Sequence, residues 1–180
     1  VKVVQADVME VDLHQLIQDE FSGLDVLVCA NLPYYITSPV IMKLLEEKLP
    51  VESLTVMVQK EAAVRICAAS GTRACGAVSV AVQYYSQPQI LFDVPRDCFF
   101  PAPNVDSAVI RLNIRKEPPV KLETEEKQFF KLVKAAFGQR RKTVVNSLNT
   151  GLGKSKEELS AALQQAGIEP TARAEQLTME

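Results

Sequence analysis

Residues 24–35 have the sequence LDVLVCANLPYY, in which a nearly continuous apolar run leads directly to an asparagine, a proline and two tyrosines. A short run that is apolar on both faces is typical of a strand in a parallel sheet covered by helices. In open α/β sheets, ligands bind outside the carboxyl ends of such strands. This stretch therefore predicts an α/β fold and the place of its functional site.

The residues before this stretch predict a β-strand, α-helix, β-strand unit. Residues 1–4 are mostly apolar and predict a buried strand that leads to Asp7. The apolar spacing within residues 13–21 predicts a helix. Two buried strands joined by a helix favour parallel pairing, so we expect both strands in one sheet.

The residues after it predict two more helices and four more strands. The helices are expected over residues 39–49 and 62–69, and the strands over 54–58, 77–85, 89–94 and 108–114. Ser38 is a good cap for the first of these helices. Turns that contain proline join the last three strands, which favours antiparallel pairing, so we expect a mixed sheet.

A proline pair at residues 118–119 separates this part from a helical C-terminal part. Proline fixes φ and has no backbone N–H, so the pair makes a stiff break. The sequence predicts an α/β domain over residues 1–116 and a helical domain over residues 117–180. Within the helical domain, Ser155 and Glu158 have the spacing of a capping box.

The composition is that of a soluble globular protein, with 180 residues, 47% hydrophobic, 23% charged and a formal net charge of −2. No apolar run approaches the roughly 18 residues that span a bilayer, so we do not expect a membrane protein. Four cysteines without a CxxC pair, and a single histidine, indicate neither a metal site nor a disulfide framework. We expect reduced, largely buried cysteines in a cytoplasmic protein.

The residue types at positions 31–34 suit the recognition of an aromatic amine. The side-chain carbonyl of Asn31 and the backbone carbonyl of Leu32 can both accept hydrogen bonds from one NH2 group. Pro33 restricts Leu32 to an extended conformation, which directs that carbonyl outward. Tyr34 offers a π face for a flat base. Such a site can hold an amine in line with a methyl donor without a strong general base, although an ordinary turn with a packed tyrosine is the alternative.

Four motifs follow one another along the chain: QAD at 5–7, NLPY at 31–34, FFPAPNVDSA at 99–108 and FGQRRK at 137–142. Together with RAE at 173–175, they resemble the family of ribosomal RNA adenine N6,N6-dimethyltransferases over essentially the whole chain. The resemblance implies a class I S-adenosylmethionine-dependent methyltransferase domain with a Rossmann-like mixed sheet, followed by a small all-helical domain. It implies dimethylation of two adjacent adenines in a 3′-terminal hairpin of small-subunit rRNA, within the pre-30S ribosomal particle.

The resemblance also implies roles for single residues. Asp7 corresponds to the carboxylate that accepts a hydrogen bond from the adenine amine of S-adenosylmethionine, whereas a turn cap is its alternative role. Asn31 and Leu32 correspond to the acceptors for the target N6, and Asn31 also to a cofactor contact. Tyr34 and Phe99 correspond to the aromatic pair that sandwiches the flipped base, although Phe99 can instead be a core residue.

The chain departs from the family pattern because the glycine-rich loop and the acidic residue that hold the cofactor have no counterpart in it. No GxGxG occurs. Two strand-helix units, about 60–70 residues at roughly 30 per unit, are expected before Val1 in a longer protein. In the family their strands lie between the strand before Asp7 and the strand before Asn31. We therefore expect that cofactor binding needs the longer protein, or that this piece reorganises or pairs with another chain.

Basic residues concentrate in the C-terminal part. Residues 111–154 contain eleven lysines and arginines against four glutamates, and residues 127–142 contain no acidic residue. Arg140, Arg141 and Lys142 are the candidates for phosphate contacts with RNA, with a solvated helix face as the alternative.

Two other functions stay open. One is a large-subunit rRNA adenine methylase of the macrolide-resistance type, and the other is a non-catalytic checkpoint module in ribosome assembly. The FGQRRK match and the helical C-terminal part favour the small-subunit enzyme.

Overall fold

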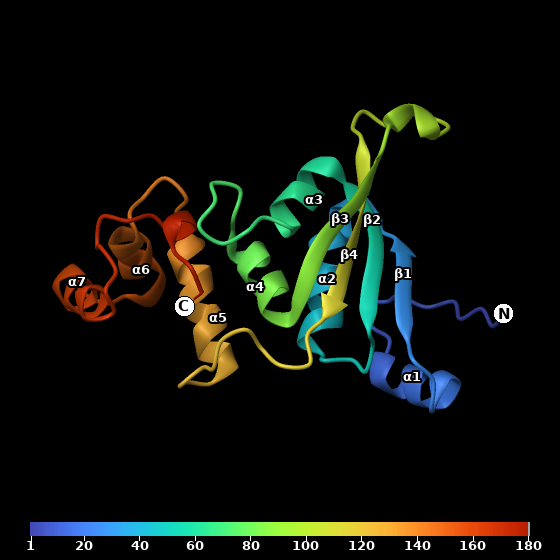
Figure 1. Cartoon of the computed structure of the whole chain (residues 1–180), viewed down its shortest axis with the longest axis horizontal. Helices are drawn as coiled ribbons and strands as arrows, with labels where there is room; N and C mark the ends of the chain where they lie inside the picture. Colours follow the sequence, from blue (N-terminus) through green and yellow to red (C-terminus); the bar gives the residue numbers. More distant parts are fainter. Residues whose placement is uncertain (180) are drawn as a thin grey trace. The chain divides into compact units, whose positions relative to one another are not determined.

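The computed structural model describes residues 1–179, which form two compact units (Figure 1). Unit 1 consists of Val1–Cys67 and Tyr85–Glu117. Unit 2 consists of Ala68–Tyr84 and the chain from Pro118 onward. One division of the chain thus falls at the proline pair, and residues 68–84 belong to unit 2 rather than to the α/β part in which the sequence placed them.

Unit 1 is built on a four-stranded mixed sheet with the strand order β1-β2-β4-β3 (Figure 1). The strands are β1 (Leu27–Asn31), β2 (Ser53–Gln59), β3 (Ser86–Val94) and β4 (Ser107–Ile114). β1 pairs with β2 in parallel, and β4 is antiparallel to both β2 and β3. The predicted mixed sheet is confirmed, as are the strands predicted near residues 24–30, 54–58, 89–94 and 108–114.

The helices of unit 1 are α1 (Leu13–Phe21), α2 (Thr37–Glu46) and α3 (Lys60–Ile66). α1 has the predicted bounds, and its N-cap is Asp12, whose carboxylate accepts a hydrogen bond from the Gln15 N–H at 3.0 Å. α2 carries one apolar stripe, which is buried. The core of unit 1 includes Val40, Ile41, Leu44 and Leu45 of α2, Leu54, Val56 and Val58 of β2, and Ala108, Ile110 and Leu112 of β4.

Residues 1–4 do not form the predicted buried strand. Val1, Val3 and Val4 are exposed, and the first strand of the described chain begins at Leu27. β1 is the edge strand of the described sheet, and no described strand pairs with residues 1–4. The backbone of residues 1–4 therefore has no ladder partner.

The cysteines are less buried than the sequence predicts. Cys75 is buried and Cys67 is half-buried, but Cys29 and Cys98 are exposed. Cys29 lies on β1, where every second residue is exposed because the edge strand is covered on one face only. The burial of the Cys29 thiol that was predicted from the apolar run is therefore wrong.

Residues 77–85 form a helix, α4 (Ala77–Tyr85), where the sequence predicts a strand. Its first turn is closed by the Ser79 hydroxyl, which accepts from the Gly76 N–H at 2.9 Å. Val80 lies in an apolar cluster, and the Tyr84 ring packs edge-on against a phenylalanine ring of the next helix. Packing thus overrides the β-propensity of the valines at every second position. The cluster contains Ala68, Cys75 and Val80, with Phe129, Val133 and Phe137 against it.

The other helices of unit 2 are α5 (Glu126–Phe137), α6 (Val144–Leu152) and α7 (Lys156–Gln165). Ser155 caps α7 by accepting from the Glu158 N–H at 3.2 Å, but the Glu158 carboxylate pairs with Lys154 instead of completing a capping box. Gly167 follows the end of α7 at a φ of +71°, the left-handed conformation that favours glycine. None of the helices in the described chain is long and apolar enough to cross a membrane.

Candidate active site

The segment after β1 is held by its backbone at the carboxyl end of the strand. Asn31 is the last residue of β1, and the Leu32 N–H donates to the Met57 carbonyl of β2 at 3.4 Å. The Leu32 side chain is buried. The Pro33 carbonyl accepts from the Ile36 N–H at 3.1 Å and from the Thr37 hydroxyl at 3.2 Å. These contacts fix the path of the chain while Asn31, Pro33 and Tyr34 stay exposed.

An open hollow of about 380 Å³ brings this segment together with the FFPAP motif. Phe99 is half-buried and Phe100 is fully exposed. All five residues that the sequence singled out for base recognition line the hollow. Its lining comprises two segments of the chain, Asn31, Leu32, Pro33 and Tyr34 from the first and Phe99, Phe100, Pro101 and Pro103 from the second.

The Tyr34 hydroxyl forms a hydrogen bond of 2.8 Å with the hydroxyl of Ser107, the first residue of β4. Ser107 is completely buried, whereas 37% of the Tyr34 surface is exposed. One end of the tyrosine is thus fixed inside unit 1 and its ring reaches the hollow. The sequence marked the motif that contains Ser107 but assigned this serine no role.

The loop that carries Phe99 is closed by Asp106. The Asp106 carboxylate accepts from the Arg96 N–H at 3.0 Å, and the Asp106 carbonyl accepts from the Lys60 N–H at 3.0 Å. The Lys60 ammonium also pairs with Asp93 at 2.6 Å. The hydrogen bond with Asp93 raises the pKa of Lys60, and the charge of that carboxylate adds to the effect.

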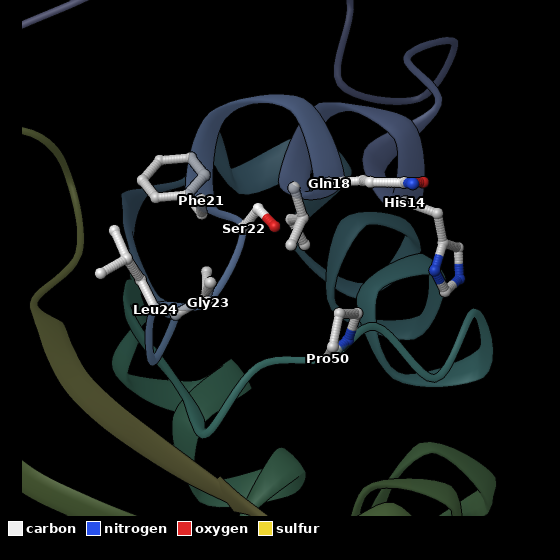
Figure 2. A pocket seen from close by; sticks show the side chains of 9 residues that line it. His14, Gln18, Phe21, Ser22, Gly23, Leu24 and Pro50 are labelled. Atoms are coloured by element: carbon white, nitrogen blue, oxygen red, sulfur yellow. The ribbon is translucent and has the colours of Figure 1, made fainter.

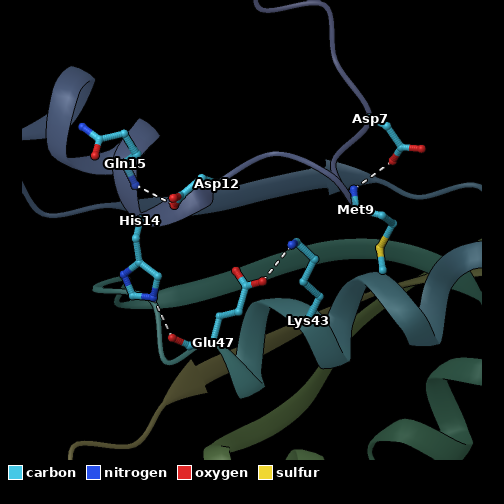
Figure 3. A network of polar contacts seen from close by, with 7 residues as sticks. All are labelled: Asp7, Met9, Asp12, His14, Gln15, Lys43 and Glu47. Carbon is cyan, nitrogen blue, oxygen red and sulfur yellow. Dashed lines mark hydrogen bonds and ion pairs between the residues drawn. The ribbon is translucent and has the colours of Figure 1, made fainter.

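Asp7 does not line this hollow, and its carboxylate caps a turn (Figure 3). The Asp7 Oδ1 atom accepts from the Met9 N–H at 2.8 Å. Its backbone carbonyl accepts from Glu10 at 3.0 Å and from Val11 at 3.1 Å. In this structure Asp7 therefore has the turn-capping role that the sequence left as an alternative, while its contact with a cofactor stays a prediction.

A second hollow, of about 310 Å³, lies beside α1 (Figure 2). It is lined by His14, Ile17, Gln18, Phe21, Ser22, Gly23, Leu24, Val26 and Pro50. The Nε2–H of His14 donates to the Glu47 carbonyl at 2.8 Å (Figure 3). Because the last carbonyls of a helix have no intrahelical partner, this contact ties α1 to the end of α2. The single histidine of the chain thus has a structural contact.

Arg140, Arg141 and Lys142 lie in unit 2, in the turn between α5 and α6, and all three are exposed. The Arg140 guanidinium donates to the Arg73 carbonyl at 2.8 Å, which orients this side chain. The structure thus brings the three predicted RNA contacts together at one turn.

The sequence profile of the family described as ribosomal RNA adenine dimethylase matches residues 1–180. The chain is 52% identical over 181 residues to ribosomal RNA small subunit methyltransferase A of Alkaliphilus metalliredigens, covering 100% of this chain and 63% of the relative. The protein of the same name from Geobacillus sp. (strain WCH70) is 49% identical over 184 residues, with the same coverage. The chain thus spans about 63% of the length of these curated relatives.

Two solved structures are similar in fold. A dimethyladenosine transferase from Plasmodium falciparum has a TM-score of 0.73 and 23% identity, and the match covers 98% of this chain and 68% of that one. The 23S rRNA methyltransferase ErmE has a TM-score of 0.62 and 25% identity, with 97% and 66% covered. These matches confirm the mixed α/β fold. With a profile match over its whole length, the chain belongs to the ribosomal RNA adenine dimethylase family.

Proposed function

We propose that the natural protein containing this sequence transfers methyl groups from S-adenosylmethionine to N6 of adenine in small-subunit rRNA. The observation that carries the proposal is the hollow in which Asn31 and Leu32 lie beside the two aromatic residues Tyr34 and Phe99. The relatives named as small-subunit methyltransferases, at about half identity over the whole chain, support the choice of substrate. Two adjacent adenines in a 3′-terminal hairpin, within the pre-30S particle, are the proposed targets.

The residues of the hollow would recognise an adenine by its amine and by its flat face. The side-chain oxygen of Asn31 and the carbonyl oxygen of Leu32 accept the two N–H groups of N6, which holds the amine in one orientation. Tyr34 and Phe99 stack on the base, which has to leave its own stack to enter the hollow. Polarising the amine and orienting it are the contributions of the protein, so no strong general base is required.

S-adenosylmethionine, when bound, supplies an electrophilic methyl group. Asp7 and Asn31 are the residues of this chain that would hold it, and both are exposed. The fit is partial, because the Asp7 Oδ1 atom already accepts from Met9 and the chain has no GxGxG loop. We propose that the rest of the cofactor site, and the first two strands of a class I sheet, lie outside these residues. The edge position of β1 in the described sheet and the greater length of the relatives support this.

Unit 2 would hold the RNA through phosphate contacts. Arg140, Arg141 and Lys142 are exposed at one turn of a segment without acidic residues, which favours an electrostatic contact with a polyanion. The proposed place of this reaction is the cytoplasm, where ribosomal particles are assembled.

The test is methyl transfer by the natural protein that contains this sequence, with labelled S-adenosylmethionine and either small-subunit or large-subunit rRNA. We expect Asn31→Ala to lower the transfer rate by about 100-fold, because one positioned hydrogen-bond partner of the reacting group is lost. Asn113→Ala, on β4 and away from the hollow, is the matched control, and circular dichroism checks the fold of both variants. Transfer that survives Asn31→Ala contradicts the assigned role. Transfer to large-subunit rRNA alone would favour the alternative of a large-subunit methylase of the macrolide-resistance type; the 23S rRNA methyltransferase ErmE is similar to this chain in fold.

A further inference from the structure

Two neighbouring residues at the start of β4 hold the two sides of the hollow. Ser107 bonds to the hydroxyl of Tyr34, and Asp106 closes the loop that carries Phe99. Tyr34 and Ser107 are 73 residues apart in the sequence, so only the fold brings them together.

Ser107 is a rigid anchor for Tyr34. Its side chain is completely buried, and its backbone pairs with Gln59 of β2 on one side and with Val94 of β3 on the other. The position of its hydroxyl is therefore set by the middle of the sheet. A hydrogen bond of 2.8 Å to this hydroxyl restrains the far end of the tyrosine, and with it the direction of the long axis of the ring.

The other side is anchored by a contact of the Arg96 side chain and by two contacts of Asp106. Its carboxylate accepts from the Arg96 N–H at the start of the loop, and the Arg96 guanidinium donates to the Asn104 carbonyl near the end of the loop at 3.4 Å. Its own carbonyl accepts from the N–H of Lys60, the first residue of α3, directly after β2. The base of the Phe99 loop is thus tied to the junction of β2 and α3.

We propose that Asp106 and Ser107 are positioning residues that set the separation and orientation of Tyr34 and Phe99 for a flat aromatic base. A base stacked on both faces needs two rings about 7 Å apart, twice the carbon contact distance of about 3.5 Å, so small displacements weaken the sandwich. The inference rests on the proposed function, in which this hollow takes the target adenine. It adds to that function the residues that adjust the sandwich without touching the base.

The first experiment tests the anchor without RNA. The four tyrosines of the chain are replaced biosynthetically by 3-fluorotyrosine, and the 19F resonances of Tyr34 and Tyr35 are assigned with Tyr34→Phe and Tyr35→Phe. We expect Ser107→Ala to shift the Tyr34 resonance and to leave that of Tyr35, which is 84% exposed, in place. An unmoved Tyr34 resonance overturns the proposal whatever the function of the hollow.

The second experiment tests recognition in the natural protein that contains this sequence. The probe is an RNA hairpin with 2-aminopurine at the target adenine, whose fluorescence rises when the base leaves its stack. We expect Ser107→Ala to reduce this rise. In methyl transfer to the same hairpin with adenine at the target, it should raise the KM for RNA by about 3- to 10-fold, as the loss of one neutral hydrogen bond allows. The KM for S-adenosylmethionine should change by less than about 2-fold, since the contact lies on the base side. Ser107→Thr keeps a hydroxyl and should restore most of the signal.

Asp106→Asn, which keeps an acceptor oxygen, and Asp106→Ala, which removes it, form the corresponding pair for the loop. We expect a greater loss of the 2-aminopurine signal for Asp106→Ala than for Asp106→Asn. If the alanine variant and the conservative variant lose the 2-aminopurine signal equally, at Ser107 and at Asp106, the positioning roles are overturned. A wild-type protein that neither unstacks nor methylates the adenine overturns the proposed function, while the fluorotyrosine experiment still decides whether Ser107 holds Tyr34.

Discussion

A Cβ atom added to Gly151 would lie 2.6 Å from the Cβ atom of Ala135, so helices α5 and α6 of unit 2 are in contact where a glycine faces an alanine. Real Cβ atoms do not come this close, and the neighbouring Ala135 Cα would be only 3.0 Å away. Ala135 is buried in the core of unit 2 together with Val144 and Leu148 of α6. The close packing of these helices therefore depends on the missing side chain of Gly151.

Replacing Gly151 by alanine should destabilise unit 2, although alanine is the better helix former. Overpacking costs about 1–3 kcal/mol, and the helix propensity of alanine offsets up to about 1 kcal/mol, so we expect a net loss in the free energy of unfolding. Urea unfolding followed by circular dichroism measures it. The double variant Ala135→Gly/Gly151→Ala moves the Cβ from one helix to the other and should recover part of the loss. If Gly151→Ala is as stable as the wild type, the helices are not packed as closely as described.

The four thiols should differ in their reaction with iodoacetamide at pH 8. Burial raises the pKa of the Cys67 thiol to about 11, so little reactive thiolate is present at this pH, and burial raises the pKa of Cys75 as well. Cys29 and Cys98 are exposed. We expect mass spectrometry to find Cys29 and Cys98 modified at least about 10-fold faster than the other two. In 6 M guanidinium chloride, all four should react at similar rates.

Binding of small-subunit rRNA by the natural protein should depend on salt through the turn between α5 and α6. Each phosphate contact contributes about 0.7–0.9 to the slope of log K against log salt concentration. Arg140→Glu/Arg141→Glu should therefore reduce the magnitude of the slope by at least about 1.4. The control is Lys154→Glu/Lys156→Glu, in which Lys154 lies before α7 and Lys156 is its first residue. It changes the net charge by the same amount as the first variant. An unchanged slope in the first variant, or an equal change in both, would show that this turn is not the RNA contact.

Calorimetric titration with S-adenosylmethionine can decide between the two roles of Asp7. In the natural protein, we expect Asp7→Ala to weaken cofactor binding by about 10-fold, because a charged acceptor is lost. Asp19→Ala, an exposed carboxylate on α1, should bind the cofactor like the wild type. If Asp7→Ala lowers only the melting temperature and leaves the affinity unchanged, the carboxylate serves the Met9 turn alone.

Local sequence patterns were enough to predict those elements whose structure is decided by residues close together in the sequence. The apolar spacing of residues 13–21 predicts α1 with its observed bounds, and Gly167 lies at the end of α7, because caps and amphipathic faces are local properties. The strand predicted over residues 54–58 is β2, and the NLPY motif at the end of β1 supplies part of the lining of the hollow.

Long-range packing decided the rest. Residues 77–85 alternate like a strand, yet burial of Val80 in the core of unit 2 makes them a helix. Residues 1–4 have the composition of a strand, but no strand of the described residues pairs with them, and Cys29 is exposed because every second side chain of β1 is exposed. The sequence by itself determined which residue types are available for base recognition. Only the tertiary structure decided that Phe99 and Tyr34 line the same hollow and that Ser107 anchors the tyrosine, because strand pairing joins segments about 70 residues apart.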